Sequence, residues 1–265
     1  MDCLFDEASN NDIDKGSTVV FESFPGGAPA NVACALSKLG LKSAFMGCVG
    51  DDEEGCQLLN LLSNIGVDAQ FCVKTESYPT RKVMVARKAN GDREFAGFWE
   101  NAPTLSFADV YYSPPRSSWE RFSELIMSES LSAVVVGTLG LAYESPTKSY
   151  MESLRTMLLS IENTVGWLPI LSHSMIFESC VHDDVQKKRP LFIVDINWRP
   201  VFWDLSERAT VAQETILSYV TNAADIVKLT DEEAAWLLGS RGVTADSALQ
   251  QPQTVFQILQ PKLVN

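Results

Sequence analysis

Histidine is almost absent from this 265-residue chain, which contains two, and its six cysteines include no Cys-x-x-Cys pair. Zinc sites combine such residues at short, regular spacings, so no zinc site is expected. Disulfide frameworks are typical of secreted chains, and the sequence shows no secretory signal. We therefore expect reduced thiols, most of them small core residues.

Basic residues are also few, because 21 lysines and arginines stand against 34 acids and the net charge is −13. A nucleic-acid partner needs a basic surface that replaces phosphate counterions, so none is expected. No apolar run approaches the ~18 residues of a membrane span. The acidic first twelve residues lack the character of a transit peptide, which predicts a cytoplasmic protein, or a plastid one if an upstream transit peptide is missing.

Two nucleotide-binding fingerprints are missing as well. The sequence contains neither a Gly-x-Gly-x-x-Gly loop nor a Walker A loop. An NAD-dependent oxidoreductase is therefore disfavoured. Phosphate binding is not excluded, because backbone N–H groups at the start of a helix hold phosphate without any net positive charge.

What the sequence does contain is an alternation of buried strands and helices, which predicts right-handed βαβ units and a mainly parallel sheet. A first strand ends at Asp6, and Gly40 closes the first helix. The next helix ends near Gly66. The further expected strands are 43–49, 133–137, 191–195 and 224–229, and the further helices about 146–162 and 209–221.

A β-hairpin interrupts this alternation. Two β-rich segments, 80–88 and 94–99, flank Ala89-Asn90-Gly91-Asp92, and Asn-Gly between apolar runs is a strong hairpin signal. The hairpin predicts a small β lobe beside the main sheet. The segment 162–188 is too long for an ordinary αβ connection and receives no structural role.

Candidate ligand-binding residues begin at Gly26-Gly27, directly before the first helix. Glycine lets a ligand approach the backbone, and the helix start offers unpaired N–H groups. A purely structural turn is nevertheless the commoner explanation of such a pair. Asn31 lies one turn into that helix, where asparagine is unfavourable. Its amide either binds a ligand or bonds to a neighbouring loop.

Two further groups of polar residues follow buried strands, at the edge where open α/β sheets bind ligands. Asp195-Ile-Asn197-Trp-Arg199 follows the strand at 191–195; here Asp195 could instead cap a helix and Arg199 form a surface ion pair. Thr230 and Glu233 follow the strand at 224–229. Their spacing is that of a capping box, while a carboxylate at this edge could also help hold Mg²⁺ through water.

The segment PGGAPANVACALSKLGLKSAFMGCVGDDEEG resembles the first signature of the PfkB (ribokinase-like) carbohydrate kinases, and DINWRPVFW and VKLTDEEAAWLLG are similar to the corresponding fructokinase regions. The resemblance covers about 2–161 and 189–265. It implies a Rossmann-like, doubly wound, mainly parallel sheet in a single domain over 1–265. A β lid would come from about 12–22 and 80–100, with 162–188 as an unmatched insert.

The resemblance also implies the site. Asp6, Gly26, Gly27 and Asn31 match the family's sugar-binding positions, and Asn197 and Arg199 match its D-x-N-x-R stretch near the nucleotide phosphates. Glu233 matches the glutamate that organises Mg²⁺, although Thr230 replaces the family's asparagine. The implied cofactors are ATP and Mg²⁺, the partner is a sugar, and a homodimer through the β lid is a mild expectation.

The family's Gly-Ala-Gly-Asp sequence, which carries the catalytic aspartate and the anion hole, does not occur in these residues. We therefore expect a C-terminally truncated kinase domain whose general base lies beyond Asn265, and little or no kinase activity from the chain as written. The leading function is an ATP-dependent sugar kinase acting on a hydroxymethyl group of fructose or a related sugar. The alternative is a non-catalytic fructokinase-like protein that acts through protein contacts.

Overall fold

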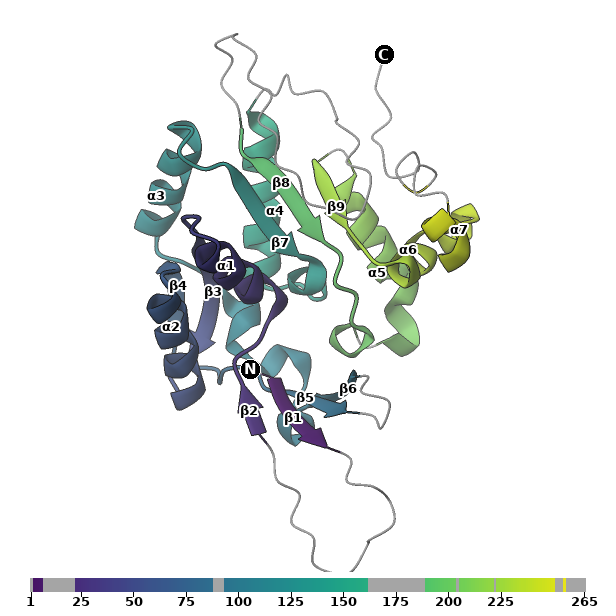
Figure 1. The fold of residues 1–265 in the computed structure, drawn as a ribbon, viewed down its shortest axis with the longest axis horizontal. Coiled ribbons are helices and arrows are strands. Elements are labelled where there is room, and N and C mark those ends of the chain that lie inside the picture. Colours follow the sequence, from purple (N-terminus) through teal and green to yellow (C-terminus); the bar gives the residue numbers. More distant parts are fainter. Residues whose placement is uncertain are drawn as a thin grey trace, which may run out of the picture. The chain divides into compact units, whose positions relative to one another are not determined.

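The computed structural model describes residues 2–6, 22–87, 93–161, 189–203, 205–221, 223–250 and 255 (Figure 1). The chain divides into two compact units. The first comprises Met1–Trp119, Gly140–Tyr150 and Arg199–Glu207, and the second Glu120–Leu139, Met151–Trp198 and Arg208–Asn265. The predicted turn at 89–92, the segment 162–188 and the lid residues 12–21 lie outside the described residues. The single domain over 1–265 stays a prediction.

A four-stranded mixed sheet in the first unit has the order β2-β1-β5-β6. β1 (Asp2–Asp6) pairs antiparallel with β2 (Glu22–Phe24) and parallel with β5 (Val83–Arg87). β5 pairs antiparallel with β6 (Arg93–Phe98), which confirms the predicted hairpin strands.

A βαβ unit follows in the same part of the chain. β3 (Ala44–Gly50) runs parallel to β4 (Asp68–Thr75), and α2 (Glu53–Ile65) connects them. Gly66 ends α2 with φ +90°, a left-handed conformation that glycine adopts without steric cost. α1 (Ala28–Lys38) carries a proline in its first turn, where the missing N–H removes no helical hydrogen bond.

The core of this βαβ unit joins both helices to the strands. Ala33 of α1 packs with Leu62 of α2 and with Val67, and all three are buried. Phe45 and Cys72 contribute from the strands. This packing fixes α1, and with it the Gly26-Gly27 turn that precedes the helix.

Three short 3₁₀ turns follow β6: η1 (Trp99–Asn101), η2 (Thr104–Ser106) and η3 (Ala108–Tyr111). α3 (Arg116–Met127) comes next. These turns, α3 and β4 were not predicted from the sequence.

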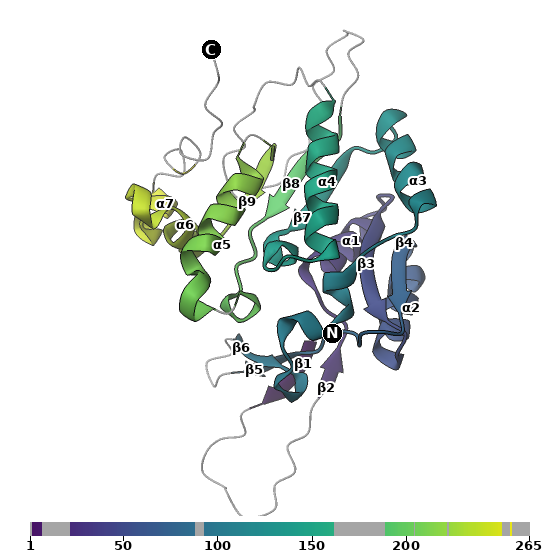
Figure 2. The same ribbon diagram turned by 180° about the vertical axis from the view of Figure 1, so that it is seen from behind.

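The second unit is built on the parallel sheet β7-β8-β9, with β7 (Ala133–Gly137), β8 (Leu191–Asp195) and β9 (Ile226–Lys228). α4 (Pro146–Ser160) and α5 (Leu205–Val220) lie over one face of it (Figures 1 and 2). The shorter elements are η4 (Thr138–Leu141), α6 (Asp231–Leu238), η6 (Gly239–Arg241) and α7 (Ala245–Gln250), with η5 (Pro200–Phe202) belonging to the first unit.

The core of the second unit explains why its strands were predictable. Phe192 and Val194 of β8 are fully buried, and so are Ile216 of α5 and Leu238 of α6. A strand covered in this way reads as a continuous apolar run. The observed helix begins earlier than the predicted 209–221, and β9 is shorter than the predicted 224–229. No helix among the described residues is long and apolar enough to cross a membrane.

Candidate functional site

The turn before α1 leaves its backbone accessible. Gly27 has φ +113° and ψ 120°, and among the described residues, apart from its two chain neighbours, no atom lies within 4 Å of the position that a Cβ would occupy. The N–H of Asn31 donates to the Gly27 carbonyl at 2.9 Å, which starts the helix, and Gly27 at the N-cap has no side chain with which to cap the first turn. The Asn31 side chain is exposed. Backbone N–H groups and an exposed amide together suit a ligand with several hydroxyl groups.

Asp6 belongs to the same unit. It is the last residue of β1, where it pairs with Arg87 of β5. This is the end-of-strand position that the sequence predicted for it. The four sugar-site residues therefore all belong to the first unit, while their roles stay predictions.

The second half of the signature, Gly50 to Gly55, forms a locked turn. Asp52 caps α2 by accepting from the N–H of Gly55 at 2.8 Å, and it also accepts from the backbone and hydroxyl of Thr80 at 2.7 and 2.6 Å. A Cβ on Gly55 would lie 2.2 Å from the Gly50 carbonyl oxygen, and one on Gly50 would lie 2.6 Å from the Thr80 nitrogen. Only glycine fits at these two positions.

These surroundings shift the pKa of the Asp52 carboxyl group. Burial raises its pKa, but the hydrogen bonds from Thr80 and Gly55 outweigh that effect and hold the pKa below its usual value. The turn is therefore most stable when Asp52 is ionised.

The stretch after β8 contains a left-handed asparagine. Asp195 ends the strand and forms an ion pair with Lys228 of β9 at 2.9 Å. Asn197 has φ +41° and is 8% exposed. A buried polar residue in this conformation is held by its surroundings, and such positions cluster at functional sites.

Glu233 is the residue that holds this stretch. One carboxylate oxygen accepts from the N–H of Trp198 at 2.7 Å and the other from the N–H of Thr230 at 2.9 Å. The Thr230 hydroxyl accepts from the Glu233 N–H at 3.1 Å, which confirms the capping box. Trp198 also stacks on Trp236 at 3.6 Å between ring centroids. Asn197 and Glu233 are thus brought together through Trp198.

This geometry bears on the expected metal. Glu233 is 7% exposed, and each of its carboxylate oxygens accepts one backbone N–H group, which leaves further lone pairs on both oxygens. Within the part of the chain that the structure describes, no group of three or more His, Cys, Asp or Glu side chains is placed to hold a metal ion. The role of Glu233 in holding Mg²⁺ through water stays a prediction.

Arg199 belongs to the first unit, whereas Asn197 belongs to the second. Its guanidinium lies over the ring of Phe95 in β6, 5.0 Å from the centroid. The predicted D-x-N-x-R stretch is therefore divided: Asn197 is anchored in the second unit and Arg199 in the first.

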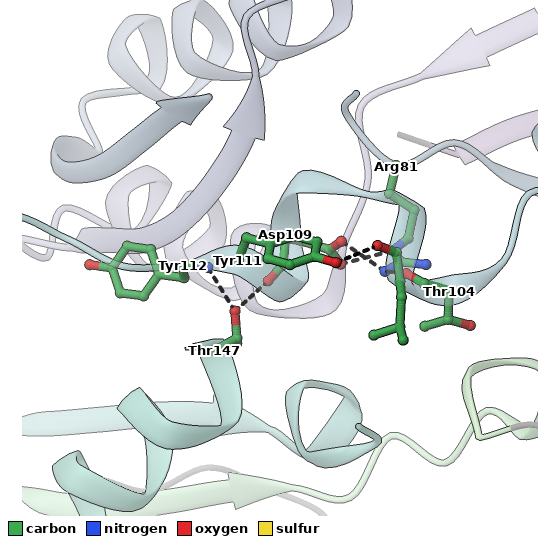
Figure 3. A network of polar contacts seen from close by, with 7 residues as sticks. Arg81, Thr104, Asp109, Tyr111, Tyr112 and Thr147 are labelled. Carbon is green, nitrogen blue, oxygen red and sulfur yellow. Dashed lines mark hydrogen bonds and ion pairs between the residues drawn. The ribbon is translucent and has the colours of Figure 1, made fainter. Parts of the chain in front are cut away.

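Sequence reasoning missed Arg81, which organises the first unit and is 7% exposed (Figure 3). It donates to both carboxylate oxygens of Asp109 at 2.8 Å and to the Thr104 carbonyl at 3.0 Å. Its guanidinium also lies 4.5–4.8 Å from the ring centroids of Phe98, Phe107 and Phe202. No pattern in the sequence distinguishes Arg81 from its neighbour Lys82.

Comparison with known proteins agrees with this architecture. The family model described as pfkB family carbohydrate kinase matches residues 1–137. Fructokinase-2 of Solanum lycopersicum is 28% identical over 229 residues, which are 86% of this chain and 57% of that protein. The chain thus spans little more than half the length of that curated relative.

Solved structures share the fold. Fructokinase from Xylella fastidiosa with bound ATP matches 98% of this chain and 66% of its own, with TM-score 0.62 and 23% identity. Fructokinase from Vibrio cholerae O395 in a form with fructose, ADP and calcium ion matches 95% and 66%, with TM-score 0.58 and 22% identity.

These likenesses confirm the ribokinase-like fold that the family resemblance implied, and with it the α/β class expected from the alternating strands and helices. The family match covers just over half of the chain and contains all four predicted sugar-site residues. This chain belongs to the pfkB family of carbohydrate kinases.

Proposed function

We propose that this protein is an ATP-dependent sugar kinase that phosphorylates a hydroxymethyl group of fructose or a related sugar. Asp6, Gly26, Gly27 and Asn31 would bind the sugar hydroxyls. Asn197 and Arg199 would bind the nucleotide phosphates, because an amide and a guanidinium supply the donors that phosphate oxygens accept.

One observation carries the proposal. The turn at Gly27 combines an open backbone with an uncapped helix start, inside the segment that matches the family. The curated plant relatives are named fructokinases, and this favours fructose among the candidate sugars.

Mg²⁺ is part of the proposal as a companion of ATP, since protein sites for Mg²⁺ normally include substrate phosphates. Glu233 would help to hold this Mg²⁺ through water, while its two carboxylate oxygens accept from the backbone N–H groups of Trp198 and Thr230 and so fix both segments.

A homodimer through the mixed sheet is also proposed. Among the described strands β2 and β6 are its outer ones, and an outer strand presents backbone groups that can pair with a second copy. Light scattering after size exclusion tests this: a dimer mass supports it, and a monomer mass at all concentrations contradicts it.

Binding is the readout for the sugar site, because the family's Gly-Ala-Gly-Asp sequence does not occur in these residues. Titration calorimetry with fructose should show saturable binding to the wild type. Asn31→Ala should weaken it at least about tenfold, the effect of losing ~1.4 kcal/mol of hydrogen bonding.

Asn60→Ala is the matched control, since Asn60 is an exposed asparagine on α2 of the same unit. Equal fructose affinity in wild type, Asn31→Ala and Asn60→Ala would exclude this sugar site. ATP binding that survives in Arg199→Met without loss would exclude the phosphate role of Arg199.

A further inference from the structure

The guanidinium of Arg199 contacts β6, a strand of the mixed sheet. It lies 5.0 Å from the centroid of Phe95 in β6, within the ~6 Å at which a cation is attracted to a ring face. Phe95 is 39% exposed, so this ring contributes little to the core. The cation over this ring, Arg199, is a residue that we assign to the nucleotide phosphates.

The segment after Arg199 is attached to the same strand. Phe202 of η5 meets Phe98 of β6 edge-on, at 5.1 Å between centroids and 87° between planes. Both rings are 7% exposed. Two residues of β6, three positions apart, therefore contact two residues of the Arg199 segment, also three positions apart.

A β-bulge in β6 allows Phe95 and Phe98 to point to the same face of the strand. Residues three apart in a regular strand point to opposite faces. In β6, however, Gly97 pairs with Met84 and Phe95 with Val85, so one extra residue is inserted between them. Gly97 has φ +114°, which suits the bulge. The insertion brings Phe95 and Phe98 to the same face.

Arg81 contacts the same pair of rings, Phe98 and Phe202, from the buried side. Its guanidinium lies 4.7 Å from the Phe98 centroid and 4.8 Å from the Phe202 centroid, and two hydrogen bonds to Asp109 fix its orientation. Arg81 therefore stabilises the buried end of the contact between β6 and residues 199–202.

We propose that Phe95 is a positioning residue for the phosphate-binding guanidinium, and that the bulged strand β6 fixes where Arg199 lies. The position of Arg199 is then set by the mixed sheet β2-β1-β5-β6, although in the sequence Arg199 comes shortly after β8. The proposal rests on the phosphate role proposed for Arg199, and it adds that a residue with no polar atom in its side chain sets nucleotide affinity.

The test measures the dissociation constant of ATP, at fixed Mg²⁺, for Phe95→Leu and Phe95→Tyr in the purified protein. Leucine keeps apolar bulk without a ring face, so ATP affinity should fall about 2–5-fold, the equivalent of one exposed cation–π contact. Tyrosine keeps the face and should restore wild-type affinity. Thermal unfolding of both variants checks that the fold is retained.

A double-mutant cycle makes the assignment specific. If Phe95 acts through Arg199, Phe95→Leu should change ATP affinity no further in the Arg199→Met background. A further loss of the same size in that background, or equal affinity in Phe95→Leu and wild type, would overturn the positioning role. An Arg199→Met variant with wild-type affinity would instead remove the phosphate role of Arg199, and the positioning role with it.

Discussion

Arg81 is a buried cation that joins residues far apart in the sequence. It starts beside β5, its hydrogen bonds reach η2 and η3, and its ring contacts reach Phe98 and Phe202. A buried charge is tolerated only when it is paired and hydrogen-bonded, as it is here. Each bond therefore fixes a loop that has little regular structure of its own.

Replacing Arg81 tests this role. Arg81→Met should lower the free energy of unfolding by about 2–4 kcal/mol, because two charge-assisted bonds and three ring contacts disappear while half-exposed Asp109 can still be hydrated. Arg121→Met removes an exposed pair with Glu124 and should cost under about 0.5 kcal/mol. Urea unfolding of both variants gives the comparison, and equal losses would show that Arg81 is not a clamp.

Gly27 and Gly239 form a matched pair for testing backbone conformation. Apart from chain neighbours and, at Gly239, backbone of its own helix, no described atom lies within 4 Å of a Cβ at either position, but φ is +113° at Gly27 and −57° at Gly239. Gly27→Ala should cost about 1–3 kcal/mol from backbone strain alone. Gly239→Ala should be neutral or stabilising by up to ~1 kcal/mol. The same change in unfolding free energy for both would contradict the assignment of strain.

Two substitutions of Asn197 separate the effect of its backbone conformation from that of its side-chain amide. Asn197→Gly removes the amide but accepts φ +41°, whereas Asn197→Ala also introduces left-handed strain of about 1–2 kcal/mol. Both variants should weaken ATP binding equally and both lose the buried side chain, so Asn197→Ala should be the less stable of the two by its strain. Calorimetric titration and thermal unfolding measure the two effects. Unchanged ATP affinity in Asn197→Gly would show that the amide does not bind nucleotide.

Sequence reasoning at this scale succeeded where chemistry is local. The capping box of Thr230 and Glu233 is a contact across one helical turn, and the spacing alone predicted it. Arg81 and Phe95 were missed because their partners are distant and, for Phe95, depend on a bulge at Gly97. No spacing rule reports such contacts.

At the scale of elements, the turn between β3 and α2 is tied to pH. The folded pKa of Asp52 is depressed from an unfolded value near ~3.9. Its contribution to stability is therefore complete above that value and disappears as pH falls through the folded pKa. Acidification should loosen the start of α2 and its bonds to Thr80.

Asp52→Asn tests this dependence. The variant should be less stable than wild type at pH 7, and the difference should shrink as pH falls from about 5 to about 3. Urea unfolding at several pH values measures it. Thr80→Ser keeps the hydroxyl and should retain the wild-type profile. A deficit in Asp52→Asn that is the same at pH 7 and pH 3 would contradict the expectation.

The predictability of the elements followed their apolar patterns. β7 and β8 are continuous apolar runs, partly or fully buried everywhere except at Leu191, and the sequence placed both of them at their observed bounds. β4 was missed, because polar residues interrupt its apolar ones. The 3₁₀ turns between β6 and α3 have no helical or strand period, since long-range contacts such as those of Arg81 hold them.

At the scale of the whole molecule, the alternation of strands and helices was enough to give the fold class, because buried parallel strands require helices to connect them. The division of the chain was not predictable. The boundary between Trp198 and Arg199 falls inside a motif that reads as one stretch in the sequence. On one side of this boundary Trp198 donates to Glu233, and on the other the Arg199 guanidinium lies over Phe95.

The parallel pairing of β1 with β5 has a consequence for the order of folding. Asp2 pairs with Val83, about eighty positions along, whereas Ala44 pairs with Asp68, about two dozen along, and distant pairings form later because a longer loop must close. During synthesis the pairing of β1 with β5 must wait until β5 has left the ribosome, although the nearer β2 is available to β1 earlier. Pulse-labelled hydrogen exchange should show protection of the amides that bond between β3 and β4 before those that bond between β1 and β5, and the reverse order would contradict this.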